Sequence, residues 1–204
     1  HRLLDVGCGR GGTAAWFQAR GWGTVTGVDL DAQSIAFARQ RYPSVHFLAG
    51  DATRLDTLGL PPFDLVYLFT ALYAFADQPA ALRQMRQVCR PGGRLLMVEY
   101  TRPLAAPLPP GLGTEIGQPL VPAKLAGVLA AAGWQLESLE DWTPHFIRWY
   151  ANLLQRFHDR KAGMLALTGA EAHAFVPRWY PELLAPRKSG QLGGARTFAR
   201  AGPS

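Results

Sequence analysis

A glycine-rich turn and three acidic residues carry the chemistry that the sequence shows most clearly. Residues 5–12 read DVGCGRGG, and glycines allow a backbone to turn tightly and to approach a ligand closely. Asp5 opens this turn, while Asp29 and Asp51 each follow a short apolar run further along the chain. A carboxylate at Asp29 can accept hydrogen bonds from both hydroxyls of a ribose, and one at Asp51 can accept from the amino group of an adenine.

The glycine turn alone fits two patterns. Gly7, Gly9 and Gly12, with an acid about 20 residues later, match the dinucleotide fingerprint G-x-G-x-x-G. Gly7, Gly9 and Gly11 preceded by Asp5 match the turn of a second family. Each acid alone also has a plain interpretation as a helix cap. Three acids at the carboxyl ends of three successive strands favour a ligand site. Asp5 suits a ligand with an ammonium and a sulfonium but adds nothing for a pyrophosphate.

The elements that must position these residues alternate along the chain. Apolar runs of strand length alternate with helical patterns, which is typical of a doubly wound parallel α/β sheet whose ligands bind outside the carboxyl ends of the strands. Strands are predicted over Leu3–Val6, Thr24–Val28, Val45–Ala49, Phe63–Phe69, Arg94–Glu99, Trp134–Glu140 and Gly193–Arg200. Helices are predicted over 13–20, 32–42, 77–88, 122–132 and 143–161, with a further one that starts in a capping box at 168–171.

Local signals predict how several of these elements begin and end. Asp31 is predicted to cap the second helix, and residues 90–93 (RPGG) are predicted to separate the 77–88 helix from the next strand. Thr143 is predicted to cap the long helix, with Pro144 in its first turn. The apolar stripe of that helix is predicted to consist of Phe146, Ile147, Trp149, Tyr150, Leu153, Leu154 and Phe157.

Five motifs, in this order and spacing, resemble the class I S-adenosylmethionine-dependent methyltransferases of small-molecule type. They are LDVGCGRG at 4–11, GVD at 27–29, GDA at 50–52, FDLV at 63–66 and RPGGRL at 90–95. The resemblance runs from Leu3 to Arg200. It implies a seven-stranded Rossmann-like sheet whose last strand is antiparallel, with a helical insertion before that strand. It also implies S-adenosylmethionine as cofactor and S-adenosylhomocysteine as product.

The resemblance assigns the turn residues to one end of this cofactor. Asp5, Gly7 and Gly9, with Cys8 between them, are expected to border its methionine part. Phe69, at the end of the fourth strand, is expected to lie beneath the sulfonium.

The residues after the second and third strands are assigned to the nucleoside end. Asp29 is expected to hold the ribose, and Leu30 to pack beside the adenine. Asp51 and the backbone amide of Ala52 are expected to read the adenine edge.

The sequence carries less information about the acceptor of the methyl group than about the cofactor. Residues 67–70 read YLFT, which lacks the Asn/Asp-Pro-Pro-Tyr/Phe motif of methyltransferases that act on nucleic-acid bases. The segment 143–188 is rich in aromatic residues and resembles the variable lid of enzymes acting on small molecules, which favours an apolar or aromatic metabolite. The alternatives are an RNA or protein methyltransferase and, third, a non-catalytic or nicotinamide-binding Rossmann protein.

Two side chains are candidates for a general base or an orienting group. Tyr73 lies just after the fourth strand, and His145 lies at the start of the long helix, where the helix N-terminus disfavours protonation of an imidazole. Methyl transfer from a sulfonium depends mainly on holding the two reactants in line, so a base is optional.

The whole chain sets the broader expectations. Its 204 residues fit one methyltransferase domain, with residues 1–100 as the cofactor-binding half and 143–188 as the lid. The net charge of +6 is spread without a basic run, which favours solubility over nucleic-acid binding. The two cysteines show no metal-ligand spacing, and no apolar window is long enough to span a bilayer, so a cytoplasmic protein with no metal is expected. Because relatives carry helices before the first strand, an N-terminal truncation is also expected; the oligomeric state stays open.

Overall fold

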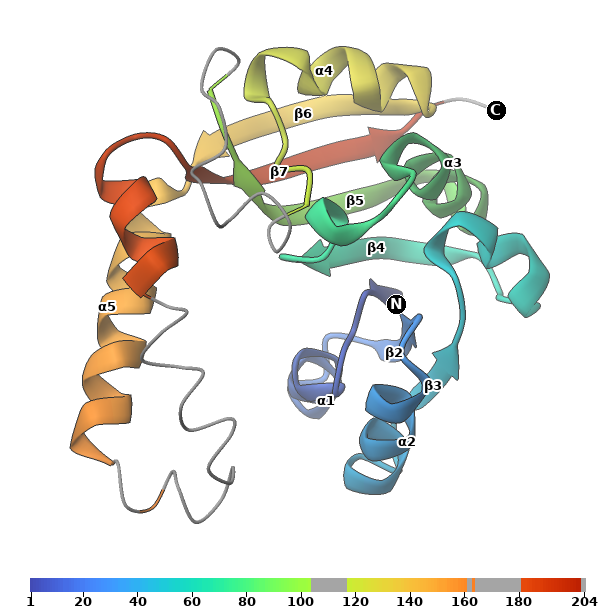
Figure 1. Ribbon diagram of the computed structural model, residues 1–204. Helices are drawn as coiled ribbons and strands as arrows, with labels where there is room; N and C mark the ends of the chain where they lie inside the picture. The colour runs from blue at the N-terminus through green and yellow to red at the C-terminus, as the bar shows by residue number, and fades with distance from the viewer. Residues whose placement is uncertain (104–116, 161–162, 164–180, 203–204) are drawn as a thin grey trace.

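Seven strands form one sheet in the computed structural model, which describes residues 1–103, 117–160, 163 and 181–202. The strands are β1 (Arg2–Val6), β2 (Thr24–Asp29), β3 (His46–Ala49), β4 (Phe63–Phe69), β5 (Cys89–Thr101), β6 (Trp134–Asp141) and β7 (Gly193–Ala201). Their order is β3-β2-β1-β4-β5-β7-β6, and β7 runs antiparallel to β5 and β6, whereas the pairings among β1 to β5 are parallel (Figure 1). The predicted doubly wound sheet with an antiparallel last strand is confirmed.

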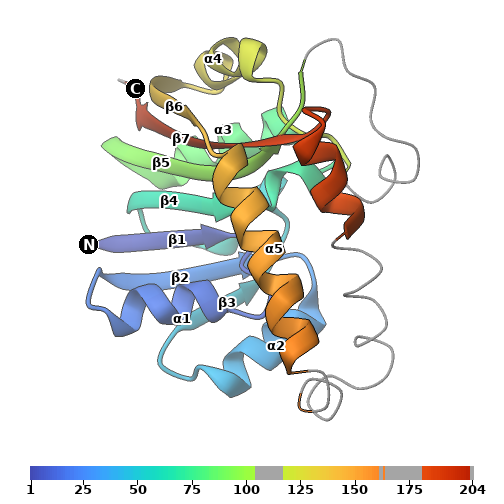
Figure 2. The same cartoon turned by 90° about the vertical axis from the view of Figure 1, so that its left-hand side faces the viewer.

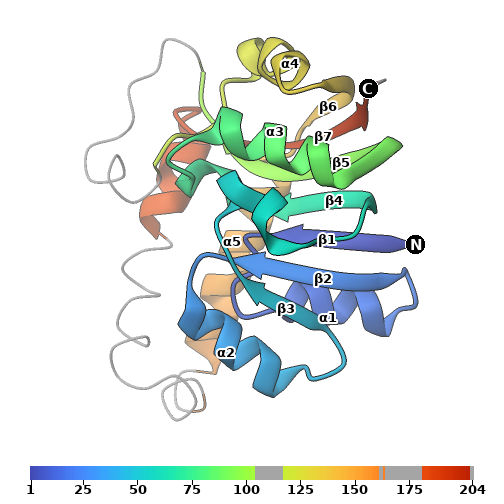
Figure 3. The ribbon, with the colours of Figure 1, turned by 90° about the vertical axis from the view of Figure 1, so that its right-hand side faces the viewer.

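Helices cover both faces of the sheet. They are α1 (Gly12–Ala19), α2 (Ala32–Arg41), α3 (Gln78–Val88), α4 (Pro122–Ala131) and α5 (Thr143–Asp159), with short 3-10 turns η1 (Ala52–Leu58) and η2 (Leu72–Ala74). Residues 181–188 are also helical. Figure 2 shows α5 crossing the face that α1 covers, and Figure 3 shows α3 and η1 on the opposite face.

Strand β4 shows why the central strands are almost continuously apolar. Val66 and Leu68 pack into the core on the α3 and α4 side. Leu65, Tyr67 and Phe69 pack into the core on the α1 and α2 side. Because successive side chains point to opposite faces and both faces are covered, neither set can be polar. Burial of each large apolar side chain stabilises the fold by about 1.5–3 kcal/mol.

Strand β5 begins earlier than the sequence predicts. It starts at Cys89, directly after α3, whereas residues 90–93 were expected to separate the helix from the strand. The Arg90 guanidinium lies 2.5 Å from an Asp64 carboxylate oxygen and ties this segment to β4. The pairing of the two strands is irregular between Phe63 and Leu65, and this irregularity accommodates the extra residues as strand.

The start of α5 also differs from the prediction. Thr143 does not cap the helix; the N-cap position is Trp142, and Asp141 Oδ1 accepts the Thr143 amide at 2.8 Å. The Thr143 hydroxyl instead accepts the Gly194 amide of β7 at 3.1 Å, so it joins the helix to the sheet. The observed helix ends at Asp159, near its predicted end.

The apolar stripe predicted for α5 is buried only in part. Phe146, Tyr150 and Phe157 are buried, but Trp149 is 55% exposed. The predicted capping box at 168–171, and the aromatic residues of the expected lid at 175, 179 and 180, lie outside the described residues.

Two features are not found among the described residues. None of their helices combines the length and the apolar character needed to cross a bilayer. Nor do the described ranges bring together three or more His, Cys, Asp or Glu side chains in a position to hold a metal ion.

Candidate functional site

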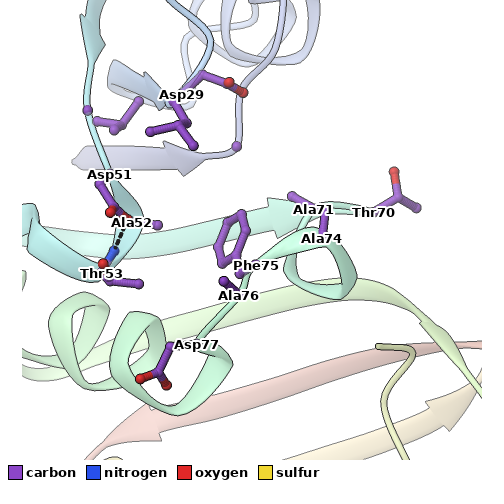
Figure 4. A pocket seen from close by; sticks show the side chains of 14 residues that line it. Asp29, Asp51, Ala52, Thr53, Thr70, Ala71, Ala74, Phe75, Ala76 and Asp77 are labelled. Carbon is purple, nitrogen blue, oxygen red and sulfur yellow. Dashed lines mark hydrogen bonds between the residues drawn. The ribbon is translucent and has the colours of Figure 1, made fainter. Parts of the chain in front are cut away.

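A cavity of about 500 Å³ lies at the carboxyl ends of β1 to β4, and we call it the strand-end cavity (Figure 4). This is the edge of a doubly wound sheet where ligands bind, because the connections on either side of β1 diverge there. The described residues that line it are Gly7, Val28, Asp29, Leu30, Gly50, Asp51, Ala52, Thr53, Thr70, Ala71, Ala74, Phe75, Ala76 and Asp77.

The glycine turn forms one wall through its backbone. The amides of Gly7 and Cys8 both donate to the Val28 carbonyl, at 2.8 and 3.1 Å, so β1 and β2 hold the turn in place. Gly7 has a φ of +74°, and a Cβ there would lie 2.5 Å from the Ala71 Cβ. Only glycine satisfies both constraints, and its lack of a side chain keeps this end of the cavity open.

Asp29 is fixed by backbone amides before any ligand binds. One carboxylate oxygen accepts the Gly9 amide at 2.7 Å, and the other accepts the Asp31 amide at 2.9 Å. Each oxygen keeps accepting capacity for a further hydrogen bond. The arrangement therefore presents a pre-oriented carboxylate to the cavity. Asp31 itself caps α2, as predicted, by accepting the amides of Gln33 and Ser34.

Asp51 combines the two interpretations that the sequence left open. It lines the cavity, and it also caps η1 by accepting the Thr53 amide at 2.8 Å (Figure 4). Hydrogen bonds from Thr53 lower the pKa of its carboxyl, so it is ionised at neutral pH. Leu30 is 76% exposed beside the same cavity, and Ala52 also lines it. An exposed leucine next to a carboxylate suits a flat, partly apolar ligand with a polar edge.

Asp5 lies deeper than the cavity wall. It is only 3% exposed, and its Oδ2 atom has no hydrogen-bond partner among the described residues. Burial raises the pKa of this carboxyl to about 7, and the nearby Tyr67 hydroxyl offsets part of the rise. A cation beside Asp5 would favour its ionised form. Burial also raises the pKa of the Cys8 thiol, so Cys8 is no nucleophile here.

The segment after β4 closes the other side of the cavity, and a buried acid holds it. Glu99 Oε1 accepts the amides of Ala71 and Leu72 at 2.9 and 3.0 Å. Burial raises the pKa of Glu99 to about 7. Thr70, just before this segment, has a φ of +51° and is the one non-glycine residue in the left-handed region across the described ranges. Such strain persists only where the surroundings fix it, and it often marks functional sites.

A second, larger cavity of about 990 Å³ lies between the sheet and α5, and we call it the aromatic cavity. Thr70 lines both cavities, so they meet there. The described residues that line the aromatic cavity are Phe17, Trp22, Leu65, Phe69, Thr70, Tyr73, Leu96, Val98, Tyr100, Trp142, His145, Phe146, Trp149, Tyr150, Leu183, Arg196 and Phe198.

The remaining predicted site residues lie on the aromatic cavity. Tyr73 packs against Tyr100 with ring centres 4.9 Å apart, and the His145 ring stacks on Trp142 at 4.6 Å. Phe69, expected near the cofactor, lines the aromatic cavity and is absent from the lining of the strand-end cavity.

The structure thus separates the predicted residues into two groups. Gly7, Asp29, Leu30, Asp51 and Ala52 line the strand-end cavity. The other predicted cofactor residues of the turn, Asp5, Cys8 and Gly9, are not among its lining residues. Thr70 could not be identified from the sequence, because a threonine after a buried strand carries no signal of backbone strain. Glu99 positions the segment after Thr70 through its hydrogen bonds to the Ala71 and Leu72 amides.

Comparisons with known proteins agree on a single family. The family model of a methyltransferase domain matches residues 4–97. The chain is 34% identical over 149 residues to the O-methyltransferase cnsE of Penicillium expansum, covering 68% of this chain and 54% of that protein. It is 33% identical over 172 residues to a demethylmenaquinone methyltransferase of Beutenbergia cavernae, covering 82% of this chain and 69% of that protein.

A solved structure supports the same fold. Phosphoethanolamine N-methyltransferase 2 of Haemonchus contortus, in complex with S-adenosyl-L-methionine, superposes with a TM-score of 0.85 at 20% identity, covering all of this chain and 49% of that one. This chain therefore corresponds to part of the length of each of these proteins. From its motifs, its sheet and its curated relatives, the chain belongs to the class I S-adenosylmethionine-dependent methyltransferases.

Proposed function

We propose that this protein binds S-adenosylmethionine in the strand-end cavity and transfers its methyl group to a small apolar or aromatic molecule in the aromatic cavity. The observation that carries the proposal is the meeting of an acid-lined cavity and an aromatic-lined cavity at Thr70. A methyl donor and its acceptor must approach each other in line, and two adjoining cavities provide that arrangement.

The donor groups of the strand-end cavity fit this cofactor. Asp29 offers a fixed carboxylate to a ribose diol, and Asp51 offers an acceptor to the adenine amino group. The unpartnered oxygen of Asp5 suits the ammonium of the methionine part, because a buried carboxylate gains most from a cation. When bound, the cofactor supplies an electrophilic methyl group.

The chain itself contributes position and the exclusion of water. Glu99 holds the amides of Ala71 and Leu72, which keeps the strained segment at Thr70 in one place. Aromatic side chains dominate the acceptor side and exclude water from a reaction that displaces a sulfide. Tyr73 and His145 line this cavity, where each can orient an acceptor hydroxyl or take up its proton.

The curated relatives support a small acceptor of this kind. One is named as an O-methyltransferase, and the other as acting on demethylmenaquinone. The lining of the aromatic cavity carries Arg196 and His145 and, among its described members, neither Asp nor Glu. Such a lining suits an apolar body with a neutral or acidic nucleophile.

A turnover assay tests the proposal. The protein is incubated with S-adenosylmethionine and a panel of phenols, naphthols and hydroquinones, with RNA and casein as macromolecular acceptors, and S-adenosylhomocysteine is quantified. We expect methylation of at least one small aromatic acceptor and none of RNA or casein. Methylation confined to RNA or casein would overturn the assignment of the aromatic cavity. Asp29→Ala serves as the control for turnover that depends on the strand-end cavity.

A further inference from the structure

Arg187 is an unusual buried cation at the edge of the aromatic cavity. It lies in the helical segment 181–188 and is only 2% exposed. Its guanidinium carbon lies 4.5 Å from the ring centre of Tyr100, 4.9 Å from that of Tyr150 and 5.4 Å from that of Phe146. All three rings line the aromatic cavity, so the cation lies within one side-chain layer of the space assigned to the acceptor.

The hydrogen bonds of Arg187 leave one edge of its guanidinium unused. Nη1 donates to the Leu183 carbonyl at 2.5 Å, and the Tyr100 hydroxyl also interacts with the guanidinium, whereas Nε and Nη2 meet no acceptor at hydrogen-bonding geometry within the described part of the chain. No carboxylate of these residues forms an ion pair with it either. Ring contacts compensate a buried guanidinium only in part, because each contributes only a small stabilisation. Leaving buried charged donors unpaired costs more than that.

The two unused nitrogens define the chemistry of a missing partner. Nε and Nη2 lie on the same side of the planar guanidinium and present two parallel N–H donors. Such a fork matches two oxygens of one carboxylate or phosphate group. A hydroxyl or an amine cannot satisfy both donors, and an amine also adds a second positive charge.

The neighbouring hydroxyls support an acidic ligand group at the same place. The hydroxyl oxygens of Tyr100 and Tyr150 lie 2.5 Å apart. Each phenol can donate a hydrogen bond only while it is neutral. Burial raises the pKa of Tyr100 well above its ordinary value, so this phenol keeps its proton and remains a donor. One of the two phenolic protons is used within this pair, so the pair offers at most one O–H donor beside the cation.

We propose that the acceptor molecule carries a carboxylate or phosphate group in addition to its apolar body, and that this anion binds the Nε–Nη2 edge of Arg187 beside the Tyr100–Tyr150 hydroxyl pair. The inference rests on the proposed function, since it assigns the acceptor of that same aromatic cavity. It selects acidic apolar compounds from the range of molecules that the cavity can hold, and it excludes amines.

Arg196 provides the competing explanation and the matched control. It lines the aromatic cavity directly, its guanidinium carbon lies 4.8 Å from the Trp142 ring centre, and its Nε also lacks a partner among the described residues. However, its Nη2 already pairs with Glu140 at 2.5 Å. Its free fork is therefore incomplete, and its charge is partly neutralised.

The test measures binding of a matched series by isothermal titration calorimetry, with saturating S-adenosylhomocysteine present. The probes are naphthaleneacetate, naphthyl phosphate, naphthylethanol and naphthylethylamine, which share one apolar body. We expect one of the two anions to bind about tenfold or more tightly than the alcohol, and the amine to bind most weakly. The order of the two anions distinguishes a carboxylate from a phosphate. Equal affinity for anion and alcohol, or no binding of any probe, would overturn the proposal.

Variants then identify the residue that causes the preference for an anionic probe over the alcohol. Arg187→Gln is expected to abolish it, Arg187→Lys to retain part of it because the charge remains without the fork, and Arg196→Gln to leave it in place. A preference that disappears in Arg196→Gln and persists in Arg187→Gln would contradict the assignment. If Arg187→Gln does not fold, the affinities of the four probes for the wild type and for Arg187→Lys still test the proposal. A titration of S-adenosylhomocysteine alone separates the two proposals, because its failure counts against the cofactor assignment and not against the anion preference.

Discussion

The strand-end cavity and the aromatic cavity are built in different ways. The first is assembled from residues within a few positions of the ends of β1, β2, β3 and β4, and its polar groups are fixed by nearby backbone amides. The second takes its wall from α1, β4, β5, β7, α5 and the helical segment 181–188. Polar recognition is thus encoded locally here, while apolar recognition depends on packing between distant segments.

Gly7 should be the position where the strand-end cavity is most easily destroyed. Gly7→Ala places a side chain in the left-handed region, at a cost of about 1–2 kcal/mol, and drives its Cβ against Ala71. We expect affinity for S-adenosylhomocysteine to fall by about 100-fold or more, measured by calorimetry. Gly59→Ala is the matched control, because its φ is also positive, no atom lies within 4 Å of the added Cβ, and Gly59 does not line the cavity. Equal losses in the two variants would show that the contact with Ala71 is unimportant.

Substitutions of Glu99 should show how strongly the segment at Ala71 and Leu72 depends on one buried acid. Glu99→Ala leaves the amides of Ala71 and Leu72 without their acceptor, so we expect the free energy of unfolding to drop by about 2 kcal/mol or more. Glu99→Gln keeps an acceptor oxygen and should lose much less. Chemical denaturation measures both. If the glutamine variant is as unstable as the alanine variant, the hydrogen bonds to the two amides do not fix this segment.

Asp5 should make cofactor binding in the strand-end cavity depend on pH. Its pKa is raised from 3.8 to about 7, and an ammonium binds only its ionised form, so affinity for S-adenosylhomocysteine should rise by up to about tenfold per pH unit as pH approaches 7 from below, then level off. Calorimetry between about pH 6 and pH 8 measures this.

The same shift has the opposite effect on the stability of the empty protein. Because the native state holds a proton that the unfolded chain releases, the free energy of unfolding should fall as pH rises from about 4 to about 7. Glu99, with a pKa of about 7, contributes in the same direction, so affinity is the more specific readout. Asp5→Asn should flatten the affinity profile. An unchanged slope in that variant would remove Asp5 from the site.

Tyr73 and His145 should affect turnover without affecting the cofactor. Tyr73→Phe and His145→Gln remove a hydroxyl and a titratable ring from the aromatic cavity, and we expect each to lower kcat about tenfold or less, since methyl transfer depends mainly on position. Affinity for S-adenosylhomocysteine should stay unchanged. Weaker cofactor binding in either variant would mean that the two cavities are not separate in function.

The sequence was sufficient for the sheet and for most of the strand-end cavity. Alternating apolar runs predicted seven strands, and the acids at Asp29 and Asp51 marked where two of them end. These features depend on residues close together in the chain, so local pattern identifies them. The early start of β5 was missed because the pairing of Cys89 with Phe63 and the ion pair between Arg90 and Asp64 are contacts with β4, which the local turn signal of residues 90–93 does not reveal.

The aromatic cavity was only outlined by the sequence. Periodicity suggested that α5 is amphipathic, but it did not show that Trp149 stays exposed while Tyr150 is buried against Tyr100. Nor does a lone arginine in a helical pattern reveal that it is buried among three rings, as Arg187 is. Such features follow from tertiary packing, which is not encoded in local spacing.

The most direct test of the central claim is calorimetric titration of S-adenosylhomocysteine into the wild-type protein and into Asp29→Ala. We predict saturable binding by the wild type and a loss of about 1–3 kcal/mol in the variant, because two ribose hydroxyls lose their acceptor. Asp31→Ala, which removes only the neighbouring cap of α2, should bind like the wild type. No binding by the folded wild-type protein, or equal affinity in Asp29→Ala, would contradict the assignment of the strand-end cavity to this cofactor.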